Sequence, residues 1–260
     1  MEDSDEVLKR IEQSKTIETL NLSNLQLKAL PSQLISLVHL KYLFLDNNKL
    51  IFVPEVGSLV NLEELSIENN EFTLIPEVYY NLKNLKSLNL SKNSLKMLSS
   101  KMFESYQNLS ILWLNGCGLM HLPKEIRFLK FLEKLGLKDN CLPEVPEEMG
   151  ELVNLKWLNL EKNEIEILPE SFAKLKKLKH LNLAYNRLGE IPRFFIDFKN
   201  LNILLLRGNQ IKNFTDEFAL GLSYLNKCDL RDNLFVNNLK TTNADFFNQI
   251  LTIDNFLIQN

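Results

Sequence analysis

A motif of about 23 residues recurs along most of the chain, and this period constrains the fold more than any other feature. Residues 155–177 read LKWLNLEKNEIEILPESFAKLKK, with leucine or isoleucine at positions one, four, six and eleven and asparagine at position nine. Copies of the motif begin at Ile17, Leu40, Leu62, Leu85, Leu109, Leu132, Leu155, Leu178, Leu201 and Leu225. A period kept over ten copies predicts a solenoid, in which each repeat packs against its two neighbours.

The first part of each repeat alternates apolar and other residues as a strand does. In the copy that begins at Leu155, we expect Leu158 and Leu160 to point into the core, while Trp157, Asn159 and Glu161 point outward. The ninth position is Asn at 48, 70, 93, 140, 163, 186, 209 and 233. A buried amide is costly unless its donor and its acceptor are both used. This position therefore needs a defined hydrogen-bonding role.

The second half of most repeats carries an apolar-proline pair. These pairs are Leu30-Pro31, Val53-Pro54, Ile75-Pro76, Leu122-Pro123, Val145-Pro146, Leu168-Pro169 and Ile191-Pro192. Proline fixes φ and removes an amide that a tight arc outside the sheet would struggle to satisfy. Ser99 and Thr215 replace it in the fourth and ninth repeats, which are also one residue longer than most. We expect a locally altered, more helical outer arc at these two places.

These motifs resemble the 23-residue, Leu-Pro-containing class of leucine-rich repeat proteins over about residues 17–240. That class includes Ras-suppressor and Scribble-type scaffolds, plant intracellular Ras-group relatives and leptospiral proteins. The resemblance implies an α/β solenoid: a horseshoe of about ten parallel concave strands, with helical or irregular convex arcs and short helical caps at both ends. It also implies that the asparagines form a ladder with the backbone of neighbouring turns. Leu25 and Cys117 depart from the ladder, the first in a terminal repeat and the second as a known alternative in the family.

The two ends of the chain fall outside the repeat, so we divide it into residues 1–16, 17–238 and 239–260. In the first segment Asp3 or Ser4 can cap a short helix whose apolar side would cover the first strand; that side carries Val7, Leu8 and Ile11. In the last segment a helix is expected from Thr242 or Asn243. Its apolar side would cap the last strand or, alternatively, dock another chain.

The resemblance implies a protein-binding module that works through its concave face. Outward strand positions that carry large apolar groups have the composition of interface residues, although they could also pack on one another as ordinary surface. The candidate partner-binding residues, with charged neighbours included, are Tyr42, Phe44, Glu64, Glu68, Ile111, Trp113, Trp157, His180, Tyr185, Ile203, Leu205 and Arg207.

Charge is unevenly distributed over the same face. The second and third repeats carry Asp46, Glu63, Glu64 and Glu68, and the last two carry Arg207, Lys227 and Arg231. A partner of opposite polarity could be oriented along the groove by this difference. The alternative is an ordinary solvated face.

Signatures of catalysis are missing. The chain has no glycine-rich phosphate loop and no GxSxG motif, and no cofactor or metal is expected; Cys117 and His121 have a ligand-like spacing, but the first occupies the ladder position. The formal net charge of −3, without a basic cluster, argues against nucleic acid, and no apolar run is long enough for membrane insertion.

The function expected is a non-catalytic, cytoplasmic scaffold or adaptor in signalling. The acidic N-terminus has no secretory signal, and three cysteines form no even framework, which fits a reducing compartment. The family resemblance suggests a small GTPase, a phosphatase or another signalling protein as partner. The alternative is a bacterial secreted or surface protein that binds host molecules, and an enzyme is a more distant third.

Overall fold

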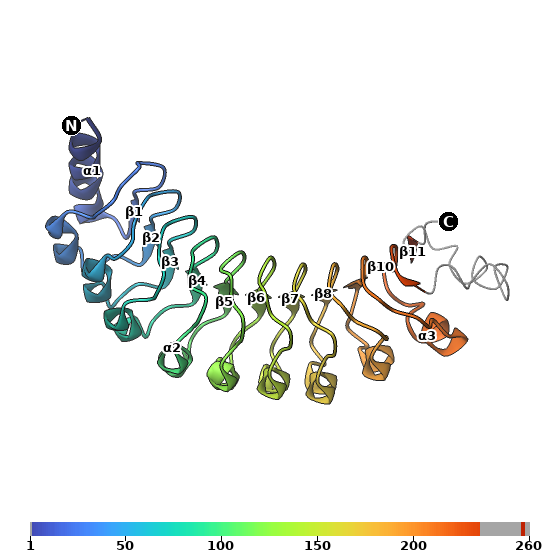
Figure 1. The fold of residues 1–260 in the computed structure, drawn as a ribbon. Helices are drawn as coiled ribbons and strands as arrows, with labels where there is room; N and C mark the ends of the chain where they lie inside the picture. Colours follow the sequence, from blue (N-terminus) through green and yellow to red (C-terminus); the bar gives the residue numbers. More distant parts are fainter. Residues whose placement is uncertain (1, 235–255, 258–260) are drawn as a thin grey trace.

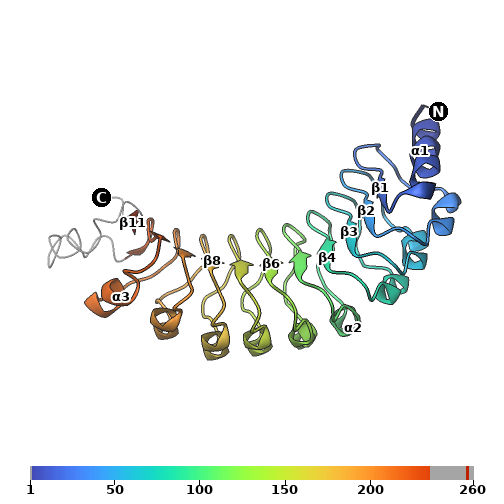
Figure 2. The same ribbon diagram turned by 180° about the vertical axis from the view of Figure 1, so that it is seen from behind.

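The chain folds into a curved solenoid, seen here in a computed structural model that describes residues 2–234 and 256–257. The short helical turns lie along the outer side of the curve, and the strands lie nearer its inner side (Figures 1 and 2). This arrangement is the open horseshoe that the repeat predicts. Its curvature follows from bulky turns on one side and closely spaced strands on the other.

The strands form one parallel sheet in sequence order. They are β1 Thr19–Asn21, β2 Tyr42–Phe44, β3 Glu64–Ser66, β4 Ser87–Asn89, β5 Ile111–Trp113, β6 Lys134–Gly136, β7 Trp157–Asn159, β8 His180–Asn182, β9 Ile203–Leu205, β10 Lys227–Asp229 and β11 Phe256–Leu257. Equivalent positions pair throughout, as in Leu135 beside Leu158 and Leu158 beside Leu181. The middle residue of each repeat strand points inward and is buried, because successive side chains of a strand alternate between its faces.

Most outer arcs are single turns of 3-10 helix that begin at or just after the proline. They are η2 Ser32–Ser36, η3 Pro54–Ser58, η4 Glu77–Asn81, η5 Lys124–Phe128, η6 Glu147–Glu151, η7 Glu170–Lys174 and η8 Arg193–Asp197. The two longer repeats carry α-helices instead, α2 Ser100–Ser105 and α3 Asp216–Gly221. Residues Ser99 and Thr215, which replace proline, stand at their N-caps. The expectation of more helical arcs in these repeats is confirmed.

The ninth-position asparagines form the expected ladder. The Asn163 side-chain amide donates to the carbonyl oxygens of Leu137 at 2.9 Å and Leu160 at 3.0 Å, and its oxygen accepts from the Leu142 amide at 3.1 Å. One side chain therefore links two neighbouring repeats. Cys117 keeps part of this role, since its Sγ lies 3.3 Å from the Leu90 carbonyl oxygen.

A second asparagine ladder runs along the strand-entry edge, and the sequence analysis did not identify it. Asn61, which immediately precedes the first leucine of its repeat, donates to the Val38 carbonyl oxygen. An asparagine at the same position makes the equivalent hydrogen bond in four later repeats. The members are Asn61, Asn84, Asn108, Asn154 and Asn200. The signal was present in the sequence as Asn-Leu at five of the ten repeat starts.

The N-terminal helix α1 spans Glu2–Gln13 and is followed by the 3-10 turn η1, Ser14–Thr16. Val7 and Ile11 are buried against the first repeat. Two details of the prediction are wrong. The helix begins before Asp3. Leu8 is exposed, because only the side of the helix that carries Val7 and Ile11 is buried.

At the other end, β11 pairs parallel with β10, placing Cys228 beside Phe256. The helix expected from Thr242 or Asn243 lies outside the described residues, and the three domain boundaries stay a prediction. Within the described part of the chain, none of the helices has the length and apolar character needed to cross a bilayer.

Candidate functional site

The outward strand positions form rows that run across the sheet. The third position of each repeat gives a row that passes from Tyr42 to Lys227, and the fifth gives a row from Phe44 to Asp229. Neighbouring rows project from the same face, which we call the concave face. All twelve candidate residues lie on this face or at the strand ends beside it, and none of them is buried.

Three of the candidates form one aromatic cluster, made of Trp113, Trp157 and His180. The Trp113 and Trp157 rings meet edge to face with centroids 5.1 Å apart. Trp157 then stacks on His180 at 5.3 Å with an interplanar angle of 15°. These are favourable aromatic geometries, and they hold three ring systems in a fixed arrangement across repeats five to eight. The two tryptophans are half-buried, which leaves part of each ring accessible.

Gly136 makes the contact between the tryptophans possible. It is the fifth-position residue of the intervening repeat, directly beside Trp113 in the sheet. A Cβ at this position would lie 2.5 Å from a Trp113 ring carbon and 2.8 Å from the Asn115 side-chain oxygen. The Trp113 indole therefore occupies space that any other residue would fill. The strand pattern predicts that Gly136 occupies an outward position, but it gives no sign of this role.

The position of His180 affects its protonation. Burial lowers the pKa of His180, and the Lys227 ammonium lowers the pKa further. A neutral imidazole at pH 7 can stack on Trp157 and still offer one ring nitrogen as a donor and the other as an acceptor. The cluster is thus an apolar surface with one polar edge.

Other apolar candidates continue the cluster on both sides. Ile111 lies one repeat before Lys134 in the third row, and Ile203 follows His180 in the same row. Leu205 lies in the fifth row beside Asn182. The short outward residues near them, Asn182 and Ala184, are buried. In the third row the apolar area is continuous from Trp157 through His180 to Ile203, and Lys134 separates it from Ile111.

Tyr185 and Arg207 form a separate pair at the edge of this area. The Arg207 guanidinium carbon lies 5.7 Å from the Tyr185 ring centroid, and Arg207 Nε donates to Asp232 at 2.7 Å. Gly208 leaves room for the tyrosine, since a Cβ there would lie 2.5 Å from the ring. Arg207 is therefore neutralised within the chain.

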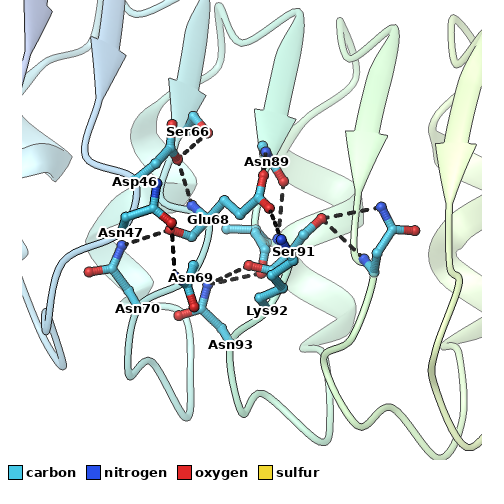
Figure 3. A network of polar contacts seen from close by, with 12 residues as sticks. Asp46, Asn47, Ser66, Glu68, Asn69, Asn70, Asn89, Ser91, Lys92 and Asn93 are labelled. Atoms are coloured by element: carbon cyan, nitrogen blue, oxygen red, sulfur yellow. Dashed lines mark hydrogen bonds and ion pairs between the residues drawn. The ribbon is translucent and has the colours of Figure 1, made fainter. Parts of the chain in front are cut away.

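The second to fourth repeats present a polar network (Figure 3). Asp46 accepts hydrogen bonds from the Ser66 hydroxyl and the Glu68 amide. Glu68 accepts from Asn89 at 2.9 Å and pairs with Lys92 at 2.8 Å. Burial raises the pKa of Glu68, but these two donors outweigh it and hold the pKa below its ordinary value.

This network alters the charge pattern expected along the groove. Glu63 pairs with Lys86 at 2.7 Å, and Arg231 pairs with Asp229 at 2.6 Å, so most of the predicted opposing charges are already compensated. Glu64 has no ion pair among the residues that the structure describes. Tyr42 and Phe44 in β2 are separated from the aromatic cluster by the polar strands β3 and β4. The apolar candidates thus divide into two groups, and the candidates Glu64 and Glu68 lie in the polar region between them.

The described residues include no group of three or more histidine, cysteine or carboxylate side chains placed to bind a metal ion. Cys117 is buried in the ladder, and burial raises the pKa of its thiol to about 12. A thiol with this pKa is a poor nucleophile and a poor metal ligand at neutral pH.

Comparison with known families agrees with this geometry. Residues 84–232, more than half of the chain, match the model of a leucine-rich repeat region, and residues 61–82 match that of a single leucine-rich repeat. The chain is a leucine-rich repeat protein. No curated protein matches it.

Solved leucine-rich repeat structures resemble most of this protein. A leucine-rich repeat protein of Leptospira interrogans is 34% identical with a TM-score of 0.73, covering 86% of this chain and 62% of its own. The ectodomain of the Arabidopsis thaliana receptor kinase GASSHO1/SCHENGEN3, in complex with CASPARIAN STRIP INTEGRITY FACTOR 2, is 29% identical with a TM-score of 0.71, covering 83% of this chain and 27% of its own.

A third structure, the plant peptide hormone receptor RGFR1 in complex with RGF2, is 26% identical with a TM-score of 0.68, covering 86% of this chain and 38% of its own. The leucine-rich repeat protein described here therefore spans less than two thirds of each of these chains. Proteins of the family are typically non-catalytic binding scaffolds, and two of these neighbours are receptors captured with a bound partner.

Proposed function

We propose that this protein is a non-catalytic scaffold or adaptor that binds a protein or peptide through its concave face. The aromatic cluster of Trp113, Trp157 and His180 carries the proposal, because it holds large, partly accessible rings in a fixed arrangement on the sheet. Aromatic side chains of this kind supply most of the binding energy in many interfaces, and fixed rings lose little entropy on binding.

The proposal extends to the setting in which the scaffold works. A cytoplasmic location and a signalling partner, such as a small GTPase or a phosphatase, fit the class that the repeats resemble. The 34% identity to a Leptospira interrogans protein supports a second candidate, a bacterial secreted or surface protein that binds host molecules. Fractionation of the native cells separates the two, since the first predicts the protein in the cytoplasmic fraction and the second predicts it outside.

Site-specific photo-cross-linking tests the binding face. A photoreactive amino acid at Lys134, which is exposed on the concave face, should cross-link a partner in native lysate, whereas the same group at Lys176 on the far side should not. Replacing Trp113 and Trp157 by Ala should abolish the cross-link. Circular dichroism of the double variant provides the folding control. Persistence of the same cross-linked partner in a folded double variant would show that the wrong face has been chosen.

A further inference from the structure

Five residues of the third row form an apolar strip with a cation at each end. In register across β6 to β10 they are Lys134, Trp157, His180, Ile203 and Lys227. The three middle side chains are half-buried, and the two lysines are exposed. We call these five residues the lysine-bounded row.

The two lysines differ from the other cations of this half of the face. Lys138 pairs with Glu161 at 3.0 Å, Arg207 pairs with Asp232 at 2.7 Å, and Arg231 pairs with Asp229. Neither Lys134 nor Lys227 has an ion pair within residues 2–234. Among the described residues the nearby carboxylates are therefore committed, and neither lysine has a carboxylate partner.

Their separation matches an extended peptide. Four strand intervals of about 4.8 Å place the lysine Cα atoms roughly 19 Å apart. An extended chain rises about 3.3 Å per residue, so six residues cover roughly 20 Å. Side chains of such a chain point alternately to its two faces, so residues one, three, five and seven would face the row.

We propose, building on the function proposed above, that the lysine-bounded row binds an extended peptide segment with the pattern acid-x-apolar-x-apolar-x-acid. The two carboxylates of the segment pair with Lys134 and Lys227, and its two apolar side chains pack on Trp157, His180 and Ile203. Opposite charges at both ends fix the register of the peptide and exclude basic sequences, while the apolar contacts supply most of the affinity.

Immobilised seven-residue peptides test this pattern with the full-length protein. One set carries Glu at positions one and seven, Leu, Ile or Phe at three and five, and Ser elsewhere. Two further sets replace both Glu residues by Gln or by Lys. Wild-type protein should bind the Glu set about tenfold more tightly than the Gln set and should discriminate further against the Lys set. Both tryptophans lie in the cluster, so their fluorescence reports binding of soluble peptides.

Charge reversal supplies the decisive variant. Lys134→Glu combined with Lys227→Glu should invert the preference, so that the Lys-flanked set binds best. The matched control reverses two exposed lysines that follow the helical turns η4 and η7, Lys83→Glu with Lys176→Glu, and should keep the wild-type order. Trp157→Ala should weaken binding of all three sets.

The remaining outcomes separate this inference from the proposed function. Equal binding of the Glu and Gln sets, still weakened by Trp157→Ala, would overturn the acidic pattern and leave the binding face intact. Absence of binding to every set would also overturn the pattern, while cross-linking from Lys134 would decide the binding face independently. Concentration-dependent self-association that the Lys134/Lys227 reversal abolishes would identify a second copy of the chain as the occupant instead.

Discussion

At the scale of single residues, the asparagines show how a polar group is placed in an apolar stack. Asn163 is 7% exposed, yet its amide and carbonyl groups both have backbone partners. A buried polar group whose partner is removed costs far more free energy than an exposed one. The two ladders therefore differ in their importance for stability although both consist of asparagine.

Asn163→Ala should lower the free energy of unfolding by about 1–3 kcal/mol, because it leaves the Leu142 amide without its acceptor. Asn154→Ala is the matched control, since its hydrogen bond to the Lys130 carbonyl oxygen is exposed to water. That variant should change stability by no more than about 0.5 kcal/mol. Urea denaturation measures both, and equal losses would contradict the distinction between the two ladders.

His180 predicts a specific pH dependence. Its pKa is lowered in the folded state, so the unfolded state binds the proton more readily between the two pKa values. The stability that neutral His180 contributes should be complete above about pH 6.5 and should be lost as the pH falls through the folded-state pKa. His180→Gln should remove this part of the pH dependence. NMR titration of the ring gives the folded value directly, and a value at or above that of an ordinary histidine would contradict the prediction.

At the scale of elements, the candidate site depends on what lies between its strands. Trp113 and Trp157 come from β5 and β7, and their rings meet because β6 contributes Gly136. The strand pattern predicts that both tryptophans point outward. It does not predict that their rings meet, because that contact depends on which residue the intervening strand places beneath the rings. The outer arcs show the same dependence, since loss of proline and one extra residue convert a 3-10 turn into the α-helices α2 and α3.

Gly136→Ala should displace the Trp113 ring, because the new Cβ would lie 2.5 Å from it. The expected result is altered tryptophan fluorescence and a loss of stability of about 1–3 kcal/mol, typical of overpacking. Gly189→Ala is the control, since a Cβ there meets nothing within 4 Å. Unchanged fluorescence in the Gly136 variant would show that Gly136 does not position the aromatic cluster.

At the scale of the whole molecule, the solenoid is modular because each repeat contacts its neighbours through equivalent positions. Leu135, Leu158 and Leu181 lie side by side in successive strands. Removal of one complete repeat would place Leu135 beside Leu181 and preserve the register. Removal of a part of a repeat would instead bring outward positions into the core.

Deletion of residues 155–177 should therefore give a folded, shorter solenoid with reduced stability, while deletion of residues 155–165 should not fold cooperatively. Circular dichroism and urea denaturation distinguish the two. The first variant also lacks Trp157, so it should lose the partner that cross-links from Lys134. A cooperative transition of equal midpoint in both variants would contradict the modular description.

The sequence by itself determined the solenoid, the parallel strands and the side of the sheet on which each candidate lies, while the asparagine ladder was implied by the resemblance to leucine-rich repeat proteins. It could do so because a period of 23 residues repeats the same local choice of buried and exposed positions ten times, and each repeat needs only its neighbours. The three-dimensional structure decided which outward side chains meet. Three features arise between strands, where side-chain length and neighbouring space determine the contacts: the Trp113–Trp157–His180 stack, the compensated charge of Glu68 and Arg207, and the lack of an ion pair at Lys134 and Lys227 among the described residues. Those contacts are set by packing across repeats, which a period along the chain does not encode.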